Sequence, residues 1–271
     1  MGDVYKGYRI ISGTSNEITE QLDNPIGWYT NQYAIIHNID DDTEKEMRWN
    51  GEKFVSLRLP PSKFIKGKNS LQRCALDMLV NPSITVCALL GLPGSGKTFQ
   101  AVQCGVYCVR EKGYQSRILG LREPLNAADG RELGFLPGDL ASKAEFTRIP
   151  FQQQFDGEQW EVDRMQQREE IDFNIIAYIK GQTFNSAYVI VDEAEDLSKK
   201  QIKLVGTRLG ENSKVVFDGD IKQSEIDISD NNPLQLMCNE LKGNPLFACV
   251  TLNEDVRSET SKLFATLFDK S

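Results

Sequence analysis

The sequence GLPGSGKT, from Gly91 to Thr98, follows an apolar run at 84–90 and precedes a stretch with helical spacing at 99–107. A strand, a glycine-rich loop and a helix in this order give the context in which G-x-x-x-x-G-K-[ST] predicts a phosphate-binding loop. Glycines let the backbone come close to a phosphate and tolerate positive φ angles. The N-terminus of the following helix adds unpaired N–H groups and a partial positive charge. We therefore expect a nucleoside triphosphate to bind here.

Two residues at the end of this loop are expected to act on the phosphates. Lys97 would reach the β- and γ-phosphates, and the Thr98 hydroxyl would be a ligand of Mg²⁺. The other loop residues that we expect to bind the nucleotide are Gly91, Leu92, Pro93, Gly94, Ser95 and Gly96.

A second apolar strand, predicted at 187–191, ends in two acidic residues, Asp192 and Glu193. Parallel strands deliver such residues to their carboxyl ends, where α/β sheets bind ligands. Asp192 is expected to hold Mg²⁺, and Glu193 to orient or deprotonate the attacking water. The pair favours hydrolysis of ATP over transfer of its phosphate to a small molecule.

A third strand, predicted at 214–217, is followed by Asp218-Gly219-Asp220 and by Gln223. The Gln223 amide stands where it could sense the γ-phosphate. Strands also expected at 117–121 and 247–252 alternate with helices at 71–80, 233–241 and 258–268, and a charged stretch at 158–172 has a helical composition. This alternation predicts an α/β fold with a mostly parallel sheet.

Composition limits the classes of protein that fit. The chain has 271 residues, with 31 Lys plus Arg against 39 Asp plus Glu, and the net charge of −8 argues against a protein that coats duplex DNA through bulk charge. Its 6 cysteines form no C-x-x-C pair, and no apolar run has the length of a membrane span. We expect a cytoplasmic protein without membrane contact. The single histidine, His37, lies in a predicted strand, which argues against a histidine-based hydrolase.

The first part of the chain has a different pattern. Strands are expected at 8–11 and 32–36, and a hairpin is expected to turn at Asn50-Gly51, the strongest short turn signal. Pro60-Pro61 and the basic stretch after them mark a linker. We therefore predict a small β-rich N-terminal domain at residues 1–62 and a larger domain at 63–271.

Several stretches together resemble the PhoH-like ATPases of bacteria and their viruses. They are GFLPGD at 134–139, the segments 177–195 and 207–223, and EDVRS at 254–258. The resemblance covers about residues 64–268 and implies a RecA-like P-loop core. It also implies that Gln72 contacts adenine, and that Arg208 and Arg257 act near the phosphates or across a subunit boundary.

Some members of this family carry a PIN nuclease domain, act as RNA helicases and form hexameric rings. The N-terminal region resembles the β-rich linker of those longer relatives, and no PIN domain is expected in this sequence. The sequence also departs from the family pattern: Glu195 stands where glutamine is common, and Lys180 and Gln182 replace an R-G-R arrangement. Arg122-Glu123-Pro124 stands where the family reads R-P.

Two functions from different classes remain open. The first is a Mg²⁺-dependent, helicase-like ATPase that acts on single-stranded RNA or DNA, as a homo-oligomeric ring. A candidate pore stretch at 180–182 and local positive charge favour it, the basic residues being Lys63, Lys66, Lys68 and Arg73. The second is an ATP-dependent switch or assembly module for a protein partner, which the acidic total charge favours. A small-molecule phosphotransferase is a third, weaker alternative.

Overall fold

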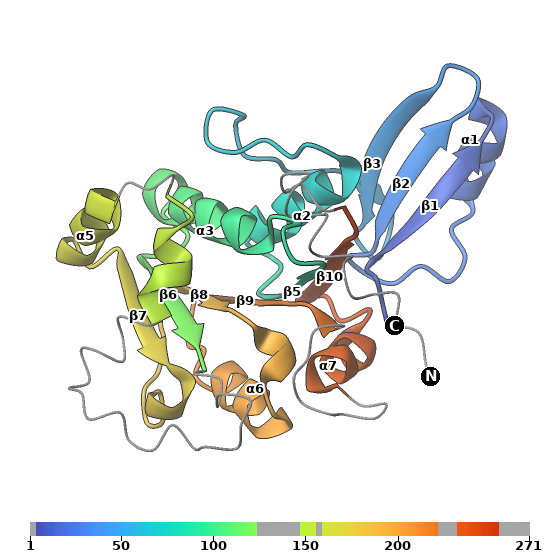
Figure 1. The fold of residues 1–271 in the computed structure, drawn as a ribbon. Coiled ribbons are helices and arrows are strands. Elements are labelled where there is room, and N and C mark those ends of the chain that lie inside the picture. The colour runs from blue at the N-terminus through green and yellow to red at the C-terminus, as the bar shows by residue number, and fades with distance from the viewer. Residues whose placement is uncertain (1–3, 124–146, 156–158, 222–231, 255–271) are drawn as a thin grey trace, which may run out of the picture.

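The computed structural model describes residues 4–123, 147–155, 159–221 and 232–254. They form two sheets, one of four strands near the N-terminus and one of six strands in the rest of the chain. In Figure 1 the small sheet, drawn in blue, stands beside the carboxyl-terminal strand β10 of the larger sheet. The structure therefore has the predicted plan, a P-loop α/β domain of the RecA-like type with a small sheet before it.

The small sheet has the order β1-β2-β3-β4 and begins with a β–α–β unit. Strands β1 and β2 are parallel because helix α1 runs between them, and the chain then turns back twice in antiparallel pairs. Thr14 and Glu17 form a capping box that fixes the start of α1. The bounds are β1 Tyr8–Gly13, α1 Ser15–Asp23, β2 Tyr33–Asn38, β3 Thr43–Trp49 and β4 Phe54–Ser56.

The large sheet is entirely parallel, in the order β10-β5-β9-β8-β6-β7. Its central strands are buried along their whole length, which explains their continuous apolar sequences. Strand β9 lies between β5, which leads into the glycine loop, and β8, which ends before Asp192. The bounds are β5 Val86–Gly91, β6 Arg117–Arg122, β7 Ile171–Ile175, β8 Ala187–Val191, β9 Lys214–Gly219 and β10 Phe247–Leu252.

Helices cover both faces of this sheet, so the domain has three layers (Figure 1). Alternate residues of each strand separate into two hydrophobic clusters, as the two-residue period of a strand requires. Helices α2 (Ser70–Val80) and α3 (Lys97–Tyr107) pack in one cluster. Helices α6 (Lys199–Gly206) and α7 (Pro233–Leu241) pack in the other. This places α3 directly behind the glycine loop.

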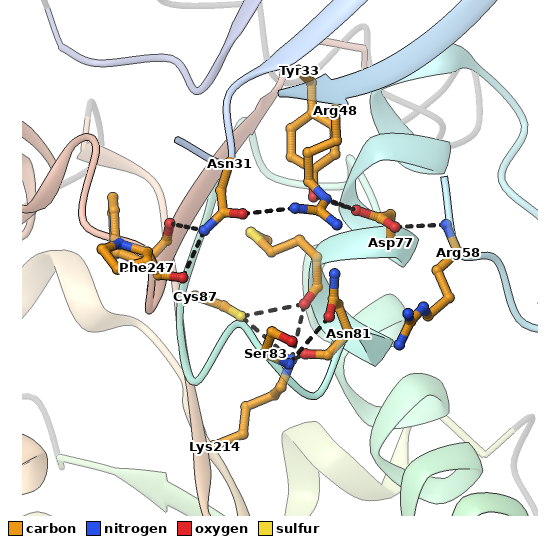
Figure 2. Close-up of polar contacts among 12 residues, drawn as sticks. Asn31, Tyr33, Arg48, Arg58, Asp77, Asn81, Ser83, Cys87, Lys214 and Phe247 are labelled. Carbon is orange, nitrogen blue, oxygen red and sulfur yellow. Dashed lines mark hydrogen bonds and ion pairs between the residues drawn. The ribbon is translucent and has the colours of Figure 1, made fainter. Parts of the chain in front are cut away.

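The two sheets are joined through Asp77, a fully buried carboxylate in α2 (Figure 2). Its oxygens accept from Arg48 Nε and from the Tyr33 hydroxyl, each at 2.9 Å, and from the backbone N–H of Arg58 at 2.6 Å. Arg48 also donates to Asn31, whose amide reaches the Phe247 carbonyl at the start of β10. The small sheet is thus bound to the helix and the strand that flank the glycine loop.

A buried lysine closes the other end of α2. The Lys214 ammonium, at the start of β9, donates to the carbonyls of Met78 and Asn81 at 2.9 Å each (Figure 2). A cation at a helix C-terminus satisfies carbonyls that the helix itself leaves unpaired. Lys214 therefore ties α2 to the centre of the large sheet.

The helical prediction at 158–172 was wrong after Gln167. The helix α5 spans Gln159–Gln167, and the chain then turns and forms the edge strand β7 from Ile171. The buried Ile171, Phe173 and Ile175 alternate there with two polar residues, the exposed Asp172 and the half-buried Asn174. Each side chain accepts from the next backbone N–H along the strand, that of Phe173 at 2.8 Å and that of Ile175 at 2.9 Å.

Other predictions from the sequence were confirmed, concern residues outside the described ranges, or remain untested. Helix α6 was not predicted, whereas the strands β1, β2, β5, β6 and β8 to β10 and the helices α2 and α7 were, within a few residues. The closing helix at 258–268 and GFLPGD at 134–139 lie outside the described residues. The domain boundary near residue 62 stays a prediction.

We expect Asp77→Ala to lower the free energy of unfolding by about 3–5 kcal/mol, because it leaves Arg48 buried without its carboxylate. Urea unfolding followed by circular dichroism measures the loss. The control is Asp42→Ala. The Asp42 side chain is 92% exposed, so the loss of its contact with His37 should lower the free energy of unfolding by less than about 1 kcal/mol. Equal losses in the two variants would contradict the role given to Asp77.

Candidate nucleotide site

The glycine loop connects β5 to α3 with the backbone angles that only glycine adopts readily. Gly91, Gly94 and Gly96 have φ values of 151°, 77° and 85°. Gly91 also packs tightly, since a Cβ there would lie 2.3 Å from the Leu252 carbonyl oxygen in β10. Gly96 is the N-cap of α3, so the loop ends where the helix N–H groups are unpaired. The geometry is that of a phosphate cradle.

Lys97 lies across this loop. Its ammonium donates to the carbonyls of Gly91 at 3.0 Å and Leu92 at 3.2 Å. Both carbonyls belong to the same turn that a phosphate would approach, so the positive charge is already held at the loop.

Thr98, in the first turn of α3, donates its hydroxyl hydrogen to Asp218 at 2.6 Å. Asp218 is buried at the carboxyl end of β9, the strand next to β5. Burial and the nearby Asp192 raise the pKa of the Asp218 carboxyl to about 7, although Lys97 and Thr98 oppose the shift. Because the hydroxyl donates to Asp218, its oxygen lone pairs stay free to bind a cation.

Asp192 and Glu193 follow the end of β8, as predicted, and both contact Arg122 at the end of β6. The distance from the Arg122 guanidinium to Asp192 is 3.2 Å. Burial raises the pKa of the Asp192 carboxyl, while Arg122 opposes the shift. Glu193 has a φ of 51°, an uncommon backbone angle for this residue type that is typical of functional sites. One guanidinium is therefore shared by the two carboxylates and offsets part of their charge.

A further buried carboxylate, Glu195, lies at the same edge of the sheet. A Cβ on Gly219 would lie 2.4 Å from Glu195 Oε2, so the side chain packs against the end of β9. Burial raises the pKa of Glu195 to about 7. Glu195, Asp218 and Arg122 were not predicted as site residues from the sequence. The available signal was their common position at the carboxyl ends of neighbouring parallel strands.

The structure brings Gln72 to the loop but places Arg208 far from it. In the first turn of α2, the Gln72 amide donates to the Ser95 carbonyl at 3.3 Å and accepts from Lys68 N–H at 2.8 Å. Arg208 follows α6 and lies beside the bridge that joins Phe184 to Leu209, before β8 and β9 begin. That edge of the sheet is opposite to the loop. Gln223 and Arg257 lie outside the described residues.

The donor set suits a magnesium nucleotide. Thr98, Asp192 and Asp218 offer hard oxygen ligands, which Mg²⁺ prefers. In the described part of the chain, no group of three or more His, Cys, Asp or Glu side chains is arranged to hold a metal ion.

The parallel sheet has a glycine loop after β5 and an acidic pair after β8, and strand β9 lies between these two strands. This arrangement defines a RecA-like P-loop α/β protein. The profile of the PhoH-like protein family matches residues 64–269. The chain therefore belongs to the PhoH-like family, whose members are in general ATP-binding P-loop proteins.

Relatives with curated names support this assignment. A protein named PhoH2 from Mycolicibacterium smegmatis is 31% identical over 209 residues, which are 76% of this chain and 48% of that protein. A PhoH-like protein from Synechocystis is 32% identical over 223 residues, 82% of this chain and 66% of its own length. The chain thus spans about half the length of the PhoH2 relative. None of the helices in the described ranges combines the length and apolar character that crossing a membrane requires.

We expect Asp218→Asn to change the pH dependence of stability. A carboxyl whose pKa is about 7 in the folded chain and near 3.8 when unfolded takes up a proton on folding between these pH values, so the free energy of unfolding falls as the pH rises through this range. The amide cannot ionise, so the free energy of unfolding of the variant, measured by urea unfolding at each pH, should rise relative to that of the wild type from pH 5 to pH 7, by up to about 1.4 kcal/mol per pH unit.

Asp23→Asn, a change at an exposed position at the end of α1, is the control and should leave the pH profile unchanged. A constant difference between Asp218→Asn and the wild type across this range would contradict the raised pKa.

Proposed function

We propose that this chain is a Mg²⁺-dependent ATPase that couples hydrolysis to action on single-stranded RNA or DNA. The observation that carries the proposal is the meeting of Lys97 and Thr98 with the acidic pair Asp192 and Glu193 at one edge of the sheet. Lys97 would neutralise the β- and γ-phosphates. Thr98 and Asp192 would hold Mg²⁺, which supplies charge neutralisation on the phosphate oxygens when bound.

Glu193 is proposed to orient and deprotonate the attacking water. Its carboxylate adjoins Asp192 and contacts Arg122, which would hold it in place. Gln223 is proposed to sense the γ-phosphate. Gln72, held against the loop backbone through Ser95, is proposed to contact adenine. The cysteines of the chain are free and buried, which favours a reducing compartment. We therefore also propose a cytoplasmic location.

We expect Glu193→Gln to bind ATP but to lose turnover by about 10²–10⁴-fold, because the amide keeps the shape of the side chain and cannot accept the proton of water. Phosphate release and ATP binding are measured on the same preparation. Lys97→Ala is the inactive reference, and Glu20→Gln, an exposed change on α1, is the matched control. Turnover near that of the wild type would remove Glu193 from this role.

An exposed turn supports contact with a nucleic acid. Lys180, Gly181 and Gln182 are exposed after β7, and the Tyr178 ring beside them is 44% exposed. A cation next to an exposed aromatic ring is the combination that binds single strands, through phosphate contact and base stacking. The basic residues near the linker contribute less than the sequence suggested, because Arg73 is paired with Glu46.

We expect single-stranded RNA or DNA to raise ATP turnover, and the stimulation to weaken as salt is added. Tyr178→Ala should reduce the stimulation by removing a stacking surface worth about 1–3 kcal/mol. Trp160→Ala, which removes another exposed aromatic ring, on α5, is the control. Turnover that neither polymer changes would favour the alternative function, an ATP-dependent switch or assembly module for a protein partner.

A ring is the oligomer we propose. Arg208 lies at the sheet edge opposite to the loop and donates to the Gln182 carbonyl at 3.4 Å, so it could reach phosphates only in a neighbouring subunit. Arg257 is the other proposed arginine of the subunit boundary. Light scattering on the active protein tests this arrangement, and an active monomer would exclude it.

A further inference from the structure

Gln100 has a buried side chain whose amide has no partner in the part of the chain that the structure describes. The residue lies in the first turn of α3 and is 3% exposed. Neither its amide nitrogen nor its amide oxygen makes a hydrogen bond to a described residue. A buried polar group in this condition destabilises the fold, and in native proteins it calls for a specific explanation.

The geometry around Gly96 shows where this amide points. A Cβ built on Gly96 would lie 3.8 Å from Gln72 Nε2 and 3.9 Å from Gln100 Nε2. Side chains on a helix lean towards its N-terminus, which carries the Gln100 amide back towards the loop. Two carboxamides, one from α2 and one from α3, therefore approach the same glycine of the phosphate cradle.

The two amides differ in what they already bond. Gln72 uses its nitrogen on the Ser95 carbonyl and its oxygen on Lys68 N–H, so the protein itself satisfies and orients it. Gln100 has both its donor and its acceptor available. Its surroundings include a second buried group of the same kind, because the hydroxyl of Ser95 also makes no hydrogen bond to a described residue.

The chemistry of the amide selects one class of ligand. A phosphate group offers acceptors only, so it would satisfy the Gln100 nitrogen and leave the oxygen unpaired. The edge of adenine that carries N6 and N7 presents a donor beside an acceptor, and it pairs with a glutamine amide through two hydrogen bonds. Guanine presents O6 at the same place, an acceptor that would face the amide oxygen.

We propose that Gln100 is a second adenine-recognising residue, which acts beside Gln72 and makes the site select ATP over GTP. The assignment rests on the proposed binding of ATP at this loop. The adenine edge would then satisfy an amide that is buried and has no partner among the described residues. In the absence of nucleotide, this amide lowers the free energy of unfolding. Bound ATP would offset that loss.

The test replaces the amide with an apolar side chain of similar size, Gln100→Leu. Without nucleotide, the variant should melt about 2–4 °C above the wild type, because an unsatisfied buried amide has been removed. Its affinity for ATP should fall by about 5–150-fold, the range for one bidentate base contact, while its affinity for GTP stays unchanged. Calorimetric titration with ATP, GTP and dATP gives the affinities.

Gln103→Leu is the matched control on the same helix, since the Gln103 amide is satisfied by the Gln154 carbonyl at 2.9 Å. It should melt below the wild type and keep the ratio of ATP to GTP affinity. A lower melting temperature for Gln100→Leu, or equal losses of ATP and GTP affinity, would overturn the role of Gln100 alone.

Two further outcomes distinguish contact with the base from contact with the ribose, and the role of Gln100 from the proposed function. A loss for ATP that is absent for dATP would place the amide at the ribose and overturn its contact with the base. A wild-type chain that binds none of the three nucleotides would overturn the proposed function, and the base assignment with it.

Discussion

Negative charge at the carboxyl edge of the large sheet is the constraint on which the site depends. A parallel sheet brings the ends of β8 and β9 to one edge, and the sequence places Asp192, Glu193, Glu195 and Asp218 there. Carboxylates this close destabilise one another unless protons or cations offset the repulsion. Arg122 offsets it at the end of β8, and the raised pKa values of Asp218 and Glu195 offset it at the end of β9. The edge therefore attracts a cation, such as the magnesium that accompanies a nucleotide.

The small N-terminal sheet is connected to this edge through helix α2 and strand β10. Helix α2 carries Gln72 in its first turn, at the glycine loop, and Asp77, which binds the small sheet, slightly more than one turn later. A force on the small sheet would therefore reach the loop through a rigid element, and a change at the loop would reach the small sheet in the same way. Such a connection suits either a motor or a switch, since both must couple the nucleotide to a second surface.

Local patterns predicted most of the fold and part of the site. The glycine loop, the acidic pair after β8 and the Asn-Gly turn each depend on a few adjacent residues, so the sequence alone is enough to find them. The pairing of Thr98 with Asp218 and of Arg122 with Asp192 joins residues distant in the chain, and only the strand order decides such partners. The strand β7 was missed although its buried and polar residues alternate, because it has five residues and directly follows a charged stretch with a helical composition.

That same strand has a consequence for how chains assemble. β7 ends the sheet, and its outward N–H groups at Phe173 and Ile175 are occupied by the side chains of Asp172 and Asn174. A strand from another molecule would find these donors already used, so it could not extend the sheet there. The side chains of Asp172 and Asn174 thus protect this edge of the sheet against pairing with a strand of a neighbouring molecule, the contact from which a fibre grows.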